Sequence, residues 1–258
     1  MKNATLRLDG QRVLITGVSR PMGIGATLAR RFAEAGAIVA VHGFSGYDMT
    51  VNKDCLTSMP NGTETVVEKL RGEGHDITLI TSSDFAQKGT AARVVEEAVQ
   101  KLGGLEGLVL NHCYGTHFEI GQWTEEDIDP HLTVNIRACM MMIQAFAAQV
   151  DITRENAITL FTSGQSDGPM TCEIAYCVAK EAINCLCRQA SALLSDKGIR
   201  VNCINPGAND TGYYFGDTSK WCTPNDAADL VLFLHSGYAK CITGQVIASD
   251  KGYGFTGY

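Results

Sequence analysis

Tyr176 and Lys180 lie four positions apart in a stretch of helical period, so both side chains are expected on one face of a helix. An ammonium group near a phenol favours the phenolate, and we therefore expect Lys180 to lower the pKa of Tyr176 from its ordinary value of about 10. A phenol with a lowered pKa can exchange a proton near neutral pH. This spacing is common by chance, so its meaning depends on the motifs around it.

A glycine-rich segment, residues 16–25, follows the first apolar run and opens the first stretch of helical period. Glycines let the backbone turn tightly and approach a pyrophosphate, and the helix N-terminus offers free N–H groups to that anion. An ordinary strand-to-helix turn is the alternative interpretation. The residues expected to contact the phosphates are Gly17, Ser19, Arg20, Gly23, Ile24 and Gly25.

The residues after the second apolar run indicate which dinucleotide is bound. An Asp or Glu there would bind the ribose of NAD, but residues 42–46 contain no carboxylate. Arg20 and Ser45 are instead placed to meet a 2'-phosphate, which favours NADP(H) over NAD(H). A solvated Arg20 is the alternative.

Strands and helices alternate along the chain. Short apolar and β-branched runs predict buried strands at residues 12–16, 37–42, 76–81, 108–111, 157–162, 199–204 and 244–248. Stretches of helical period lie between them at residues 23–35, 63–73, 90–102, 125–150 and 175–195. The alternation predicts an α/β fold, a single-domain Rossmann-type doubly wound parallel sheet of about seven strands flanked by helices, over residues 1–258. Residues 43–62 are expected to form a long irregular loop that is functional or disordered.

Composition and charge narrow the classes of partner. The net charge of -7 disfavours nucleic acid and anionic membranes, which both require a basic face. The most apolar helical stretch, residues 132–150, is interrupted by Asn135, Arg137 and Gln144, so no membrane span is predicted. No metal-binding spacing of Cys or His occurs, and the ten cysteines are expected to be reduced thiols of a cytoplasmic protein.

Several motifs together resemble the short-chain dehydrogenase/reductase family over essentially the whole chain. The residues that carry the resemblance are the glycine loop, Asn111, Asn135, Ser163, Tyr176, Lys180, Pro206 and Gly207. The resemblance implies an NAD(P)-dependent oxidoreductase that interconverts a ketone and a secondary alcohol by hydride transfer. A carbonyl that gains a hydride develops negative charge on its oxygen, and two preplaced hydrogen-bond donors stabilise that charge.

The resemblance also implies a role for each catalytic residue. Tyr176 would donate or accept the proton on the carbonyl oxygen, and Lys180 would lower the pKa of Tyr176 and hold the nicotinamide ribose. Ser163 would hydrogen-bond the reacting oxygen. Asn135 would position a water in a proton relay to solvent.

Further cofactor and substrate contacts follow from the same resemblance. Asp84 and Phe85 match the position that contacts adenine, and Asn111 matches the residue that stabilises the central sheet near the cofactor. The nicotinamide carboxamide would be contacted by Pro206, Gly207 and Thr211. The candidate substrate-pocket residues are Tyr114, His117, Gln165, Met170, Tyr213 and Phe215.

The chain departs from the common family pattern at three places. Its glycine loop is two residues longer, as in enoyl reductases, but those enzymes carry their tyrosine seven positions before the lysine, where this chain has Glu173. Ketone/alcohol chemistry is therefore preferred. Residues 112–114 are bulky where the family has small residues. The connection at residues 211–223 is short, which predicts an open pocket or one closed by a neighbouring subunit.

The substrate and the assembly stay open at this point. A small polar ketone is one candidate, and a 3-oxoacyl group is another if Arg154 and Lys197 hold an acidic carrier protein instead of being solvated surface charges. Apolar clusters at residues 139–143 and 183–186 are expected to pair subunits into a homotetramer or homodimer. A catalytically silent dinucleotide-binding sensor or scaffold is the alternative function, disfavoured because all four catalytic positions are kept.

Overall fold

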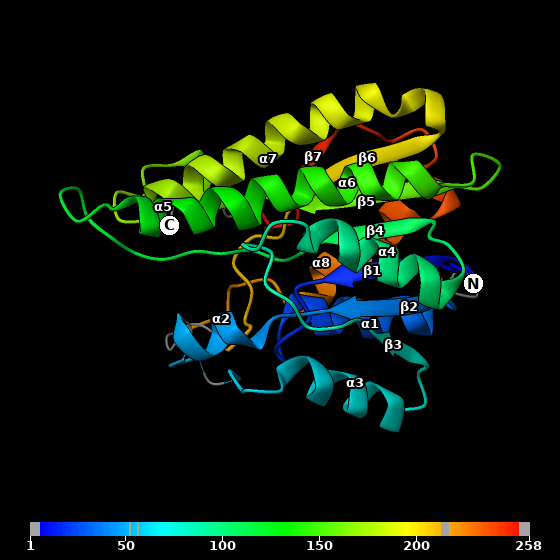
Figure 1. Cartoon of the computed structure of the whole chain (residues 1–258), viewed down its shortest axis with the longest axis horizontal. Coiled ribbons are helices and arrows are strands. Elements are labelled where there is room, and N and C mark those ends of the chain that lie inside the picture. The colour runs from blue at the N-terminus through cyan, green and yellow to red at the C-terminus, as the bar shows by residue number, and fades with distance from the viewer. Residues whose placement is uncertain (1–5, 52, 56, 213–216, 253–258) are drawn as a thin grey trace.

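Seven parallel strands form one sheet in the described part of the chain, in the order β3-β2-β1-β4-β5-β6-β7 (Figure 1). The computed structural model describes residues 6–51, 53–55, 57–212 and 217–252. The strands are β1 (Arg12–Thr16), β2 (Ile38–His42), β3 (Ile77–Leu79), β4 (Gly107–Leu110), β5 (Asn156–Phe161), β6 (Ile199–Asn205) and β7 (Val246–Ala248). The predicted doubly wound fold is therefore confirmed, and each predicted strand is present to within a few residues.

The strand order changes direction between β1 and β4. Leu14 of β1 pairs with Ala40 of β2 on one side and with Leu108 of β4 on the other. Strands β2 and β3 are added on one side of β1, and strands β4 to β7 are added in turn on its other side. In open parallel sheets a crevice forms where the order reverses, at the carboxyl ends of the strands, and ligands bind there.

Helices cover both faces of the sheet, which explains why β4 and β5 are buried along their whole length. Apolar side chains of α4, α6 and α7 form one core cluster, and those of α1, α3 and α8 form the other. The helices are α1 (Ile24–Glu34), α2 (Ser45–Thr50), α3 (Gly62–Gly72), α4 (Thr90–Leu102), α5 (Glu125–Leu132), α6 (Ala138–Gln149), α7 (Ile174–Leu193) and α8 (Pro224–His235). Short 3-10 turns occur at η2 (Gly164–Asp167), η3 (Ser195–Lys197) and η4 (Gly237–Ala239).

Three helical features differ from the sequence-based expectation. The stretch at 43–62 is not wholly irregular, because it contains α2, a helix too short to show apolar periodicity. The single helix expected at 125–150 is divided into α5, a π-helical turn η1 (Thr133–Arg137) and α6. Helix α8 adds to the five predicted stretches, and its start carries a capping box between Thr223 and Asp226.

None of the helices in the described ranges is long and apolar enough to cross a lipid bilayer. Among the same residues, no group of three or more His, Cys, Asp and Glu side chains is arranged to hold a metal ion. A single domain over residues 1–258 stays a prediction.

Four buried histidines, His42, His112, His131 and His235, have a lowered pKa and make the stability of the fold depend on pH. Burial lowers the pKa of His42 to about 4 and the pKa values of His112 and His235 to about 3, so all three are neutral at pH 7. As the pH falls below about 6.5, the unfolded chain binds protons at these imidazoles and the folded chain does not. We therefore expect the free energy of unfolding to fall toward pH 4, by up to about 1.4 kcal/mol per pH unit for each imidazole.

Urea denaturation at a series of pH values measures this slope. A His42→Asn variant should show a shallower slope, whereas His75→Asn, at a half-buried position outside the core, should keep the native slope. Equal slopes in the native protein and His42→Asn would contradict the assignment.

Candidate active site

The glycine loop joins β1 to α1 at the crevice between β1 and β4. Gly17 has a φ of 73°, and a Cβ there would lie 2.8 Å from the side-chain nitrogen of Asn111, so only glycine fits. Asn111 donates hydrogen bonds from Nδ2 to the carbonyl oxygens of Thr16 (3.2 Å) and Gly17 (3.1 Å). The amide of Asn111 thus ties the end of β4 to the loop.

Helix α1 begins directly after this loop. Gly23 is its N-cap and offers no capping side chain, so the N–H groups of the first turn, which includes Ile24 and Gly25, remain for an anion. This arrangement fits the pyrophosphate of a dinucleotide.

A pocket of about 420 Å³ adjoins the glycine loop at the carboxyl ends of β1, β2 and β4. Its lining includes five residues predicted from the sequence, namely Gly17, Ser19, Asp84, Phe85 and Tyr114. The walls are completed by Phe44, Gly46, Tyr47, Thr50 and Val51 of α2 and its N-cap, and by His42, Gly43, Ala86, His112, Cys113, Pro130 and Val134. The pocket has the position and size to hold part of a dinucleotide.

Aromatic rings form one wall of the pocket. Phe85 lies between His42 and His112, with ring centroids 4.6 Å and 4.4 Å apart. Asp84 accepts a hydrogen bond from the backbone N–H of Ala86 (2.8 Å), which fixes the turn that presents it. Neutral, stacked rings beside a carboxylate suit a nucleoside base better than an anion.

Arg20 contacts two side chains of the protein itself. Its Nε lies 3.6 Å from Oδ1 of Asp48 in α2, and its Nη1 donates to Sγ of Cys55 at 3.1 Å. Burial opposes ionisation of Cys55, but hydrogen bonds to Thr57 and Arg20 outweigh it, and the pKa of the thiol lies below its ordinary value. Ser45 is buried, and its hydroxyl accepts from the backbone N–H of Gly62 (3.1 Å).

The absence of a carboxylate at the end of β2 has a steric cause. A Cβ at Gly43 would lie 2.2 Å from Oγ1 of Thr63 and 2.4 Å from the carbonyl oxygen of Val18. No side chain fits at this position without moving the backbone.

Tyr47 of α2 spans the crevice. Its hydroxyl donates to the carbonyl oxygen of Gly115 (2.8 Å) and accepts from the N–H of the same residue (3.2 Å). Because β1 lies between β2 and β4 in the sheet, this contact crosses the end of β1 and encloses the glycine loop. Sequence reasoning missed Tyr47, since nothing in the sequence pairs residue 47 with residue 115.

The predicted catalytic residues Ser163, Tyr176 and Lys180 lie together beside the end of β5. Ser163 follows β5, and the interaction of its side chain with the Tyr176 phenol lowers the pKa of that phenol. Tyr176 lies in the first turn of α7, and Lys180 follows one turn later with 3 % exposure. The Nζ of Lys180 lies 5.5 Å from the centroid of the Tyr176 ring and donates to the carbonyl oxygen of Phe161 (2.9 Å).

The phenol pKa differs from the expected direction. Burial raises the pKa of Tyr176 well above 10, the ionisable neighbours Cys113 and Glu173 raise it further, and the hydrogen bond from Ser163 lowers it only in part. The net shift is therefore opposite to the lowering expected from Lys180, because burial outweighs the other effects; the contribution of Lys180 itself stays a prediction. The phenol is protonated at neutral pH, which suits it to donate a proton.

Asn135 lies in the π-helical turn η1, a feature that is frequent at functional sites. Its Nδ2 donates to the carbonyl oxygen of Tyr114, and its Oδ1 accepts from the N–H of Tyr114, both at 2.8 Å. Asn135 therefore holds the loop after β4 in place. The predicted role in positioning a water stays a prediction.

The loops after β5 and β6 are joined by Asn205, which sequence reasoning also missed. Its Oδ1 accepts from the N–H groups of Gly164 and Gly207, both at 3.0 Å. Pro206 and Gly207 directly follow β6 at this junction, and Thr211 is half-buried beyond them.

A polar network extends from Ser163 toward solvent. Gln165 donates from its backbone N–H to Ser163 Oγ (3.2 Å) and from Nε2 to Oε2 of Glu173 (3.1 Å). The other carboxylate oxygen, Oε1, lies 2.8 Å from Nε2 of His117. The structure thus brings together the predicted substrate residues His117 and Gln165, with Glu173 between them.

The other predicted substrate residues lie at different places. Tyr114 packs between Tyr47 and His131, with ring centroids at 5.1 Å and 4.9 Å. Met170 is half-buried before α7. Tyr213 and Phe215 lie outside the described residues.

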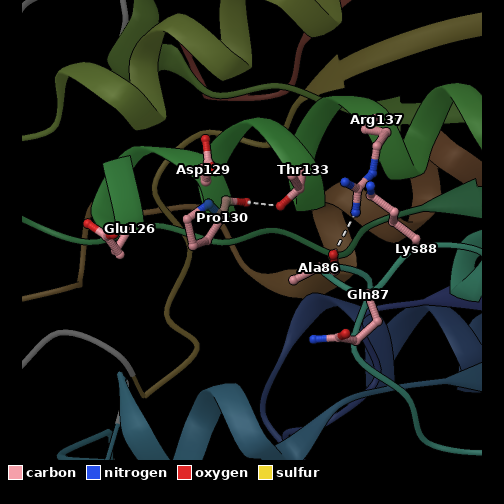
Figure 2. Close-up of a pocket in the computed structure, with 8 residues that line it drawn as sticks. All are labelled: Ala86, Gln87, Lys88, Glu126, Asp129, Pro130, Thr133 and Arg137. Carbon is pink, nitrogen blue, oxygen red and sulfur yellow. Dashed lines mark hydrogen bonds between the residues drawn. The ribbon is translucent and has the colours of Figure 1, made fainter. Parts of the chain in front are cut away.

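A wider, shallower hollow of about 670 Å³ lies beside the pocket and shares Ala86 and Pro130 with it. Figure 2 shows Arg137 reaching to the carbonyl oxygen of Ala86, with Glu126 and Asp129 of α5 lying farther along the same wall. None of the predicted site residues lines this hollow, so we do not assign the reaction to it.

Comparison with known proteins agrees with this geometry. A family model described as enoyl-(acyl carrier protein) reductase matches residues 17–254. The oxidoreductase YjdA of Bacillus subtilis is 29 % identical over 93 % of this chain and 95 % of its own length. A 2,5-dichloro-2,5-cyclohexadiene-1,4-diol dehydrogenase of Sphingobium indicum is 30 % identical over 96 % of this chain and 97 % of its own.

Solved structures show the same architecture. A crystal structure of a short-chain dehydrogenase from Burkholderia cenocepacia in complex with NADP superimposes with a TM-score of 0.81 at 26 % identity, covering 95 % of this chain and 98 % of that chain. The chain therefore belongs to the short-chain dehydrogenase/reductase family of NAD(P)-dependent oxidoreductases.

Proposed function

We propose that the protein interconverts a ketone and a secondary alcohol, with Tyr176 as the general acid and base. The observation that carries the proposal is the grouping of Ser163, the protonated Tyr176 phenol and buried Lys180, whose Nζ lies 5.5 Å from the centroid of the Tyr176 ring. Two hydroxyl donors beside one another suit the oxygen of a carbonyl group.

The residues of the chain would act in order as the carbonyl is reduced. Ser163 and Tyr176 donate hydrogen bonds to the carbonyl oxygen and orient it. A bound NAD(P)H supplies the hydride that the carbonyl carbon gains. As negative charge develops on the oxygen, Tyr176 transfers its proton there, and Lys180 stabilises the phenolate that forms.

Reduction of a carbon–carbon double bond is the competing reaction, because the matching family model is described as an enoyl reductase. Seven positions before Lys180, where such enzymes carry their tyrosine, this chain has Glu173, so no phenol is available there to donate the proton. A panel of ketones and 2-enoyl thioesters, followed at the nicotinamide absorbance, separates the two reactions. Turnover of enoyl thioesters without turnover of ketones would contradict the proposal.

NADPH remains the proposed cofactor, because Gly43 excludes a carboxylate at the end of β2 and Arg20 lies beside the glycine loop. The pairing of Arg20 with Asp48 means that Arg20 must exchange one partner for the 2'-phosphate. We expect Arg20→Gln to raise the Kd of NADPH about tenfold and to leave the Kd of NADH nearly unchanged.

Fluorescence titration with both dinucleotides measures this prediction. Arg30→Gln, which removes an arginine paired with Glu73 outside the pocket, is the matched control. Tighter binding of NADH than of NADPH by the native protein would overturn the NADP assignment.

Small polar ketones are proposed over 3-oxoacyl groups on a carrier protein. Arg154 pairs with Glu106 (3.1 Å), and Lys197 donates to the carbonyl oxygen of Ala147 (3.2 Å), so both cations already have partners. A homotetramer or homodimer and a cytoplasmic location stay predictions. The exposed side chains of Met140 on α6 and Val178 on α7 support the prediction of an assembly.

The alternative function, a catalytically silent dinucleotide-binding sensor, predicts that the protein binds NADPH and reduces none of the ketones tested.

A further inference from the structure

Glu173 lies at the start of the helix that carries Tyr176 and Lys180. It is the N-cap of α7 and precedes Tyr176 by three residues, so the two side chains lie on the same side of the helix. Its side chain is 13 % exposed and is joined through Gln165 to the hydroxyl of Ser163. Glu173 is absent from the lining of the cofactor pocket.

The network around Glu173 offers both kinds of hydrogen-bonding group. The carboxylate oxygens accept from Gln165 Nε2 at 3.1 Å and contact His117 Nε2 at 2.8 Å, and each oxygen has a second lone pair. The His117 ring is on the exposed side of the network, at 56 % exposure. A hydroxyl group both donates and accepts, whereas an ammonium group only donates and a carboxylate only accepts.

The segments that carry this network have a uniform charge. The loop at residues 113–124 is joined to the start of α7 by a hydrogen bond from the N–H of Phe118 to the carbonyl oxygen of Cys172 (2.9 Å). Residues 113–136 and 163–177 contain no Lys or Arg, and their acidic residues are Glu119, Glu125, Glu126, Asp127, Asp129, Asp167 and Glu173. This charge disfavours an anionic substituent next to the reacting carbonyl.

We propose that Glu173, with Gln165 and His117, selects an uncharged substrate that carries a hydroxyl group on the carbon next to the reacting carbonyl. This inference rests on the proposed ketone reduction and narrows it. Glu173 accepts the hydrogen bond of the hydroxyl while Ser163 and Tyr176 hold the carbonyl oxygen. Hydride addition to the carbonyl carbon and proton transfer to its oxygen then give a vicinal diol and the oxidised nicotinamide.

Four ketones of similar size test the inference: hydroxyacetone, butanone, aminoacetone and pyruvate. In the native enzyme we expect kcat/KM for hydroxyacetone to exceed that for butanone by about tenfold, as one hydrogen bond to a carboxylate would give. Pyruvate should be the poorest substrate of the four. A larger kcat/KM for aminoacetone or pyruvate than for hydroxyacetone would overturn the proposal.

Substitution of Glu173 supplies the second measurement. Glu173→Gln should reduce the ratio of kcat/KM between hydroxyacetone and butanone by about fivefold or more, because the amide oxygen is a weaker acceptor. Glu119→Gln removes an exposed acid from the same loop and should leave the ratio unchanged. If Glu173→Gln does not fold, Gln165→Leu removes one partner of the carboxylate and should also lower the ratio.

The outcomes separate this inference from the function on which it rests. A native enzyme that reduces butanone and hydroxyacetone equally well, or a Glu173→Gln ratio equal to the native ratio, overturns the hydroxyl selection and leaves ketone reduction standing. A native enzyme that binds NADPH and reduces none of the ketones, here or in the wider panel, overturns both.

Discussion

Replacing Tyr176 by Phe is expected to lower turnover by about three orders of magnitude while the Kd of the dinucleotide changes by less than about threefold. The variant keeps the ring but removes the hydroxyl that we propose donates the proton. Because the phenol pKa lies well above 10, the lost group is a protonated donor at neutral pH. Single-turnover kinetics with saturating NADPH would report the proton-transfer defect directly.

The matched control for Tyr176→Phe is the same substitution at an exposed tyrosine. Tyr238→Phe removes a hydroxyl from a side chain that is 72 % exposed and distant in sequence from the motif, and it should have native turnover. Turnover of Tyr176→Phe within about tenfold of native would refute the proton-transfer role. Thermal unfolding of both variants shows whether any loss reflects damage to the fold.

Replacing Lys180 by Met is expected to lower turnover by about two orders of magnitude and also to weaken dinucleotide binding. The ammonium is the cation positioned to stabilise a Tyr176 phenolate, from 5.5 Å behind the ring. The substitution also leaves the carbonyl oxygen of Phe161 without its donor, which should cost about 1–3 kcal/mol of stability. Steady-state kinetics and urea denaturation measure the two effects separately.

Lys197→Met is the matched control for the loss of a hydrogen bond to the backbone. Its Nζ also donates to a carbonyl oxygen, that of Ala147 at 3.2 Å, but Lys197 is exposed and lies at the opposite end of α7. Native activity in Lys197→Met with reduced activity in Lys180→Met would assign the loss to the site. Equal activity in the two variants would contradict the role of Lys180.

The combined geometry explains why a protonated Tyr176 is useful. Burial, together with the nearby Cys113 and Glu173, disfavours the phenolate until an acceptor oxygen arrives. Reduction of a carbonyl then uses the proton directly, and the reverse reaction requires prior removal of that proton. We infer that Lys180 acts mainly on the charged state formed during the reaction.

Most of the fold is predictable from local sequence patterns. The strands β1 to β7 are apolar runs bounded by turns, and β1 is found at the predicted residues 12–16. Longer helices such as α4 show strong periodicity and end at Gly103, which has a positive φ. The short α2 and the π-helical turn η1 have no comparable signal, because tertiary contacts rather than periodicity stabilise such short segments.

The proximity of the predicted catalytic residues can likewise be expected from their positions in the sequence. Ser163, Tyr176 and Lys180 lie close together because β5 ends before Ser163 and α7 returns within a few residues. Asn111 reaches Gly17 because β1 and β4 are neighbours, which the alternation of strands and helices already implies.

Other features of the site were decided only by the tertiary structure, because they depend on contacts between segments that are distant in the chain. Asp48 binds Arg20, Tyr47 reaches Gly115, and His117 meets Glu173, each across at least 28 residues. The same is true of the Tyr176 pKa, because desolvation is set by everything that packs around a group and not by its neighbours on one helix. The amino-acid sequence by itself determined the family and the sheet, since both follow from the local spacing of residues, and it also predicts the reacting groups. The electrostatic state of those groups and the partners of the pocket residues arise only when the chain is folded.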